Sequence, residues 1–167
     1  SSSSVYGNPK KIPIKESDDR KPINPYAQTK LEGEYLAKKY SEIGVSVIGL
    51  RYFNVFGHRQ SKEYAGVIKL FLEKIQQKIP PKINGDGLQT RDFVHIDDVV
   101  GANVLAMDSS VKHEFFNVGT GNSISVLDLA NVVINASGLS LKPIHGPELS
   151  GDVRATQADI ILIRKLL

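Results

Sequence analysis

Apolar positions along the chain follow two spacings, one typical of helices and the other typical of buried strands. The helical spacing predicts helices over residues 25–43, 66–77, 97–107, 125–136 and 160–167. A nearly continuous apolar run predicts a strand over residues 45–51, a further strand is predicted over residues 114–118, and short strands are expected within residues 81–97. A helix that leads into such a strand is typical of α/β proteins with a parallel sheet. The pattern therefore predicts an α/β fold.

The longest predicted helix has clear signals at both ends. Asn24 is a typical N-cap residue and Pro25 suits the first helical position, while Gly44 can adopt the left-handed conformation that ends a helix. Asp97 and Ser125 are the predicted N-caps of two later helices. Four charged residues should form the polar face of the first helix: Glu32, Glu34, Lys38 and Lys39.

Composition narrows the class of protein. The 167 residues are 41% hydrophobic and 23% charged, as expected for a soluble globular chain. The absence of cysteine excludes disulfides and thiolate metal sites, and no apolar run is long enough to span a bilayer, so a cytoplasmic location is expected. The net charge of +3 comes with scattered lysines and no basic stripe, which disfavours nucleic acid binding. Four histidines lack the spacing of metal ligands, and no metal site is predicted: His58, His95, His113 and His145.

Both ends of the sequence look interrupted. The opening residues are typical of the end of a strand that enters a loop, and the last four residues stop within a helical pattern without a cap. We therefore expect the chain to be a fragment of a longer protein.

The spacing Tyr-x-x-x-Lys occurs at three places: Tyr6/Lys10, Tyr26/Lys30 and Tyr35/Lys39. Proline at position 9 opposes a helical turn in the first pair, and the third lies in mid-helix, where a packed aromatic with a solvated lysine is the usual explanation. Tyr26 falls in the first helical turn, where loops and ligands meet. Because Lys30 shares its helix face, the ammonium would favour the phenolate, which is a usable base. A serine hydroxyl from residues 1–4 could position a substrate beside it.

A glycine pair after the strand at residues 114–118 resembles the start of a dinucleotide-binding loop. Gly119 and Gly121 are present, but the third glycine of that motif is replaced by Ile124. A tight turn with local hydrogen bonds from Thr120 and Asn122 is the favoured interpretation. If a nicotinamide cofactor binds, its pyrophosphate should be held outside this chain.

Arg91 follows a glycine turn and has two open interpretations. Its guanidinium could bind phosphate oxygens through paired hydrogen bonds. Alternatively, it could form a salt bridge with Asp92 or Asp97.

Six ordered segments carry a family resemblance. The chain resembles the sugar-nucleotide epimerases and dehydratases of the extended short-chain dehydrogenase/reductase family, with the greatest likeness to UDP-glucose and UDP-N-acetylglucosamine 4-epimerases. The resemblance covers essentially every residue. The segments are Ser1–Gly7, Pro25–Lys30, Leu50–Gly57, Asn84–Phe93, Asn117–Gly121 and Gly151–Arg154.

The resemblance implies a domain organisation. Residues 1–57 would be the C-terminal part of a Rossmann-type NAD-binding domain, and its glycine-rich N-terminal half would be absent. Residues 58–167 would form mainly the smaller α/β sugar-nucleotide substrate-binding domain. The strand and helix around residues 92–108 could return to the Rossmann domain. The family also implies a homodimer, with the helix at residues 25–43 at its interface.

Roles in the redox centre follow from the same resemblance. Tyr26 would be the catalytic base, and Lys30 would bind the nicotinamide ribose of NAD and support the phenolate. Ser2 would hydrogen-bond the reacting sugar hydroxyl. Tyr52 and Phe53 would lie against the nicotinamide.

The resemblance also implies how the UDP-sugar substrate is held. Asn54 would hold the phosphate region, Arg91 would pair with the diphosphate and Asp152 would lie near the nucleotide. Two positions depart from the family pattern, because Leu149 replaces an expected arginine and Asn84 replaces an aromatic residue. The identity of the sugar therefore stays open.

The expected reaction is C4 epimerisation through a 4-keto sugar. Family dehydratases carry Asp-Glu immediately after the catalytic hydroxyl residue, and decarboxylases keep the glutamate. Here the two positions are Ser3 and Ser4, which disfavours both reactions. A non-catalytic sugar-nucleotide binding fragment is the remaining alternative.

Overall fold

The computed structural model describes residues 1–61 and 66–167, and their fold is α/β. The helices are a 3-10 turn η1 (Ser3–Tyr6), α1 (Pro25–Ser41), α2 (Val67–Gln76), α3 (Ile96–Asp108), α4 (Val126–Ser137) and α5 (Ile161–Leu166). The strands are β1 (Ile48–Tyr52), β2 (Asn54–Phe56), β3 (Lys82–Asn84), β4 (Thr90–Arg91), β5 (Phe93–His95), β6 (Glu114–Val118), β7 (Ile124–Ser125) and β8 (Ile144–Gly146).

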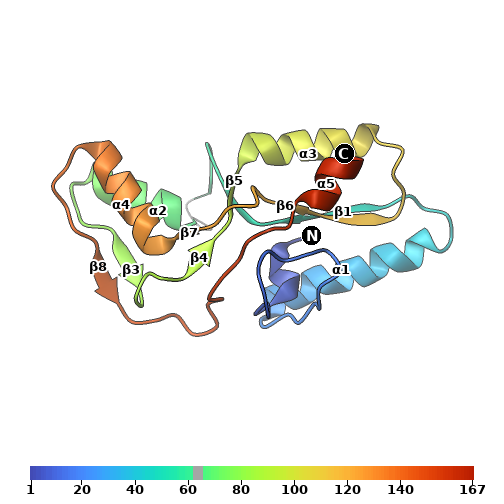
Figure 1. Cartoon of the computed structure of the whole chain (residues 1–167), viewed down its shortest axis with the longest axis horizontal. Coiled ribbons are helices and arrows are strands. Elements are labelled where there is room, and N and C mark those ends of the chain that lie inside the picture. The colour runs from blue at the N-terminus through green and yellow to red at the C-terminus, as the bar shows by residue number, and fades with distance from the viewer. Residues whose placement is uncertain (62–65) are drawn as a thin grey trace.

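The strands pair two by two. β1 lies parallel to β6, β2 to β5 and β3 to β8, while β4 and β7 are antiparallel. In Figure 1, α1 and α3 lie on opposite sides of the β1–β6 pair, and α2 and α4 lie together at the other end of the molecule. Ser2 adds an isolated parallel bridge to Tyr52, which places the N-terminal segment beside the end of β1.

Three apolar clusters fix these elements. One joins η1, α1 and the end of β1 through Val5, Leu31 and Phe53. A second packs α3 against β1 and β6. The third joins α2, α4 and β3 around Phe71 and Ile83. The assignment of residues 1–57 and 58–167 to two domains stays a prediction. Helix α3 belongs to the second range but packs against β1, which belongs to the first.

Several local predictions need correction. The helix predicted from Asp97 begins at Ile96, and its N-cap is His95, whose Nδ1 accepts a hydrogen bond from the Asp97 amide. Strand β1 begins at Ile48, three residues later than expected. Glu34 is not on the polar face of α1, because its side chain is buried. The packed aromatic expected at Tyr35 is half-exposed.

The turn after β6 is a tight turn, as predicted. The Thr120 hydroxyl donates to the Asn122 carbonyl oxygen at 3.2 Å and accepts from the Asn122 amide at the same distance. A Cβ on Gly119 would lie 2.7 Å from the Ala158 Cβ and 2.9 Å from an Asp92 carboxylate oxygen. Close packing therefore explains this glycine without a bound dinucleotide.

Across residues 1–61 and 66–167, every helix falls short of the length and apolar character that a bilayer crossing requires.

Candidate active site

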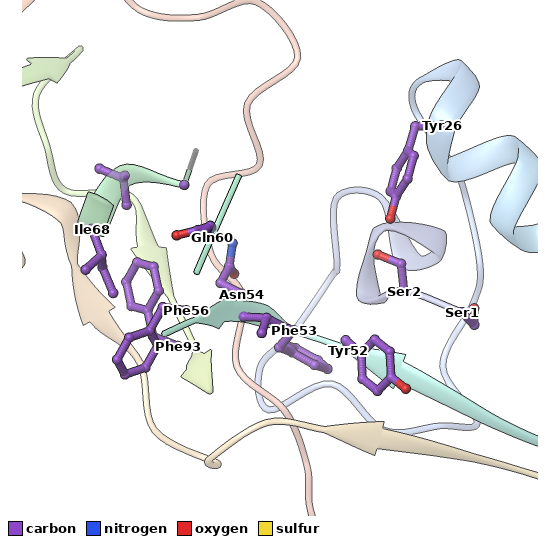
Figure 2. A pocket seen from close by; sticks show the side chains of 13 residues that line it. Ser1, Ser2, Tyr26, Tyr52, Phe53, Asn54, Phe56, Gln60, Ile68 and Phe93 are labelled. Atoms are coloured by element: carbon purple, nitrogen blue, oxygen red, sulfur yellow. The ribbon is translucent and has the colours of Figure 1, made fainter. Parts of the chain in front are cut away.

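A pocket of about 300 Å³ opens where β1 ends and the first turn of α1 approaches η1. This is the carboxyl end of a parallel strand, where open α/β sheets bind ligands. Figure 2 shows the side chains that line it. Five residues predicted from the sequence are among them: Ser2, Tyr26, Tyr52, Phe53 and Asn54.

Tyr26 is held by the start of α1. The Asn24 side chain accepts a hydrogen bond from the Ala27 amide at 2.8 Å, and Pro25 occupies the first helical position, as predicted. The Tyr26 side chain is 57% exposed and lines the pocket. The Lys30 Nζ lies 5.3 Å from the centre of its ring. The predicted phenol–ammonium pair therefore exists on one helix face.

Ser2 faces Tyr26 across the pocket. In Figure 2 the phenol oxygen is directed towards the Ser2 side chain. The Ser2 Oγ accepts a hydrogen bond from the Ser4 amide at 3.2 Å, which fixes the hydroxyl at the start of η1. Since Oγ is the acceptor in that bond, its proton can be offered to a ligand in the pocket.

The segment that leaves β1 supplies the floor of the pocket. The Tyr52 hydroxyl donates to the Asn103 Oδ1 at 3.0 Å on α3, so it is engaged outside the pocket. Phe53 is buried in the cluster that also contains Leu31. Asn54 begins β2. Tyr52 and Phe53 therefore offer aromatic carbon to a ligand, while Asn54 lines the pocket as a polar residue.

The far wall of the pocket was not identified from the sequence. It comprises Val55, Phe56, Gln60, Gly66, Val67, Ile68 and Phe93, while Ser1 lines the pocket on the side of Ser2. Phe93 lies on β5 and is brought there by the β2–β5 pairing, a long-range contact that local patterns do not reveal. Asp and Glu are absent from the lining within the described part of the chain.

Arg91 and Asp152 lie apart from this pocket, paired with each other. The Arg91 Nη2 donates to the Asp152 Oδ1, so neither Asp92 nor Asp97 is its partner. Asp152 lines a second hollow of about 190 Å³, together with Asn84 and Arg154.

Arg154 is also paired in this region. Its guanidinium donates two hydrogen bonds to the carboxylate oxygens of Asp86, each at 2.9 Å. The structure thus places two arginines, each with a carboxylate partner, at the second hollow or at its edge.

A buried carboxylate that the sequence analysis did not single out joins these regions. Asp92 is fully buried and accepts hydrogen bonds from the Thr120 amide and hydroxyl, both at 2.8 Å. It also accepts from the amides of Gly121 and Ala158, both at 3.0 Å. The Asp92 carbonyl oxygen accepts a bond from the Asn54 amide at 3.0 Å. Asp92 therefore ties the Arg91 strand to the segment that lines the first pocket.

A second buried charged cluster joins α1 and β1. Glu34 is 2% exposed and Arg51 is 3% exposed. The Arg51 Nε and Nη2 each donate to one carboxylate oxygen of Glu34 at 2.8 Å. Burial alone would raise the pKa of Glu34, but the hydrogen bonds from Arg51, Ser1 and Arg20 outweigh it and lower the pKa below the ordinary 4.5. The pair is therefore ionised at neutral pH.

This lowered pKa predicts a dependence of stability on acid. Because the folded pKa is depressed, the stability that Glu34 contributes is complete above its ordinary pKa and is lost as pH falls through the folded value. We expect the Glu34→Gln variant to lose less stability than the wild type on acidification below roughly pH 5. Urea midpoints at a series of pH values would measure this.

Two neighbours define the controls for that measurement. Burial raises the pKa of Glu16, so its effect on stability as pH falls is opposite to that of Glu34. Glu16 is present in both the wild type and Glu34→Gln, so its contribution is common to the two. Glu32→Gln alters an exposed carboxylate on the same helix and should keep the wild-type acid dependence. If Glu34→Gln also kept it, the assignment to Glu34 would be wrong.

Comparison with known proteins gives a consistent result. The profile of the NAD dependent epimerase/dehydratase family matches residues 1–119. The chain is 36% identical over 169 residues to a UDP-glucose 4-epimerase of Mycolicibacterium smegmatis, covering 100% of this chain and 54% of that protein. The chain thus spans about half the length of such relatives.

Two solved structures share the fold. One is a UDP-N-acetylglucosamine 4-epimerase from Methanobrevibacter ruminantium in complex with UDP-N-acetylmuramic acid, with a TM-score of 0.95, 36% identity, and coverage of 99% of this chain and 54% of that one. The other is a UDP-glucuronic acid 4-epimerase from Bacillus cereus in complex with UDP-glucuronic acid and NAD. Its TM-score is 0.92 at 34% identity, and the match covers 100% of this chain and 53% of that one. The predicted α/β fold of Rossmann type is confirmed.

Proposed function

Because the chain belongs to the NAD-dependent epimerase/dehydratase family, we propose that the whole protein inverts C4 of a UDP-sugar by a redox mechanism. UDP-glucose and its N-acetyl form are the proposed substrates. The observation that carries this proposal is the placement of Ser2 and Tyr26 on one pocket, with Lys30 beside the phenol.

The pocket suits the nicotinamide end of NAD. Aromatic carbon from Tyr52 and Phe53 lies beside two hydroxyl groups, which matches a flat ring next to a polar sugar. Lys30 would donate to the nicotinamide ribose. When bound, NAD supplies a hydride acceptor and then a hydride donor for C4 of the sugar.

Proton transfer would be carried out by residues of this chain. Tyr26, as phenolate, would take the proton of the C4 hydroxyl while C4 loses its hydride, which leaves a 4-keto sugar. Ser2 would donate a hydrogen bond to the C4 oxygen and hold it beside the phenol. After the ketone turns over, C4 would regain a hydride on its other face while the Tyr26 phenol returns the proton to the oxygen, which gives the C4 epimer.

The remainder of the substrate would extend beyond the first pocket. Asn54 lines this pocket and would hold the phosphate region. Arg91 would exchange its Asp152 partner for the diphosphate, which offers the same pairing with a guanidinium. Asp152 would then be free to interact with the nucleotide.

A dehydratase or decarboxylase is the alternative reaction. Elimination of water needs a group that moves a second proton, and family dehydratases use acids immediately after the catalytic hydroxyl residue. The pocket lining lacks an acid among the described residues, and the hydroxyl of Ser4 is buried. These observations favour epimerisation over both alternatives.

The test is turnover of UDP-sugars labelled with deuterium at C4 by the whole protein. We expect the C4 epimer to form with the deuterium retained at C4, because the hydride leaves and returns within one site. A 4-keto-6-deoxy product would instead indicate a dehydratase. Binding of UDP-sugars without any product would favour the non-catalytic alternative and overturn the proposal.

A further inference from the structure

Glu34 lies on the same face of α1 as the proposed catalytic pair but outside the pocket. It follows Tyr26 by eight residues and Lys30 by four, so all three positions lie along one side of the helix. Neither Glu34 nor its partner Arg51 lines the pocket. The bidentate ion pair therefore does not contact a ligand held in this pocket.

The Glu34 carboxylate binds the segments that carry the other pocket residues. The Ser1 hydroxyl donates to Oε1 at 2.6 Å, and Ser1 directly precedes Ser2. Arg51, which donates from Nε and Nη2, directly precedes Tyr52. One buried carboxylate on α1 thus holds both the N-terminal segment and the end of β1.

Arg51 holds the other end of the N-terminal segment. Its Nη1 donates to the Tyr6 hydroxyl at 2.7 Å, and that hydroxyl donates to the Asn117 Oδ1 on β6, also at 2.7 Å. The Ser2 turn is therefore fixed on both sides, at Ser1 by Glu34 and at Tyr6 by Arg51.

We propose that Glu34 and Arg51 are positioning residues that set the spacing between the Ser2 hydroxyl and the Tyr26 phenol. This inference rests on the proposed function, because the spacing matters only if both groups act on one substrate atom. A planar guanidinium and a carboxylate joined by two bonds have one favoured geometry, so α1 cannot slide along β1 without breaking the pair. Small displacements of reacting groups are costly, about a hundredfold in rate for about 1 Å.

The test is a kinetic double-mutant cycle in the whole protein. Glu34→Gln should lower kcat by about 30-fold and leave KM within about twofold, because alignment and not binding is lost. In the Ser2→Ala background the same substitution should lower kcat by less than about threefold, since there is no hydroxyl left to align. An equal loss in both backgrounds would overturn the proposal.

A stability-matched control separates positioning from general destabilisation. Ile134 is buried on α4 and belongs neither to the pocket lining nor to the cluster around Phe71, so Ile134→Ala should lower thermal stability with kcat unchanged. If this control reproduced the kcat loss of Glu34→Gln, the proposal would be wrong.

A milder variant and a second measurement cover the case in which Glu34→Gln does not fold. Ser1→Ala removes the 2.6 Å bond and keeps the ion pair, and it should show a smaller coupling of the same sign with Ser2→Ala, about threefold. Additive losses for Ser1→Ala and Ser2→Ala would contradict the proposal.

Deuterium uptake by the backbone amides of residues 2–5 gives a readout that does not need turnover. Uptake should rise in Ser1→Ala and Glu34→Gln but not in Ile134→Ala. Unchanged uptake in both Ser1→Ala and Glu34→Gln would overturn the proposal. A wild-type protein that turns over no UDP-sugar would sink the proposed function, and the uptake would still decide whether the pair holds this segment.

Discussion

Replacement of Tyr26 by phenylalanine is expected to lower kcat of the whole protein by about a thousandfold. General acid–base catalysis by a positioned side chain contributes about a hundredfold to ten-thousandfold, and this phenol would act both as base and as acid. The fold should be preserved, because the hydroxyl points into an open pocket and the side chain is 57% exposed. Turnover of the UDP-sugar measures the effect.

The chain supplies a matched control for Tyr26. Tyr35 lies on the same helix, is half-exposed and has a lysine four residues later, so it repeats the motif outside the pocket that Tyr26 lines. Tyr35→Phe should keep kcat within about twofold, as expected for a surface change away from the site. Comparable turnover in Tyr26→Phe and Tyr35→Phe would remove Tyr26 from its proposed role.

Replacement of Asp92 by asparagine is expected to lower the free energy of unfolding by about 3 kcal/mol. The carboxylate accepts four hydrogen bonds and is fully buried. The asparagine side chain keeps one acceptor oxygen and replaces the other with an NH2 group, which is a donor. Backbone N–H groups of the Gly119–Gly121 turn or of Ala158 are then left buried without an acceptor. Urea unfolding followed by circular dichroism measures the change.

Asp98→Asn is the control for that measurement. It makes the same chemical change on the exposed surface of α3, six residues along the chain. Its effect should stay within about 0.5 kcal/mol. Equal unfolding midpoints for the two variants would show that the Asp92 hydrogen bonds contribute little to stability.

The sequence could predict the start of α1 and the proximity of Lys30 to Tyr26 because the signals for both are local. Asn24 and Pro25 determine where α1 begins, and the helix then places Lys30 on the same face as Tyr26. The strand at Glu114–Val118 was also predicted to the residue, although Glu114 and Asn117 interrupt its apolar positions.

The buried carboxylates could not be found in this way. Glu34 follows a helical pattern typical of a solvated face, and its partners lie 14, 17 and 33 residues away. Asp92 stands next to an arginine, which suggested a local ion pair, yet its partners lie 28, 29 and 66 residues away. Long-range contacts that satisfy a buried charge have no periodic signature in a sequence.

The separation between the first pocket and the hollow that contains Asp152 has consequences for how such a protein can evolve. The first is built by the Ser2 turn, the start of α1 and the β2–β5 pair, whereas the second is built by residues 84–89 and 148–154. Under the proposed function, substitutions at positions such as Asn84 and Leu149 could change which sugar nucleotide is accepted without moving the groups that transfer the proton. Substrate preference could therefore diverge between lineages while the chemistry is inherited intact.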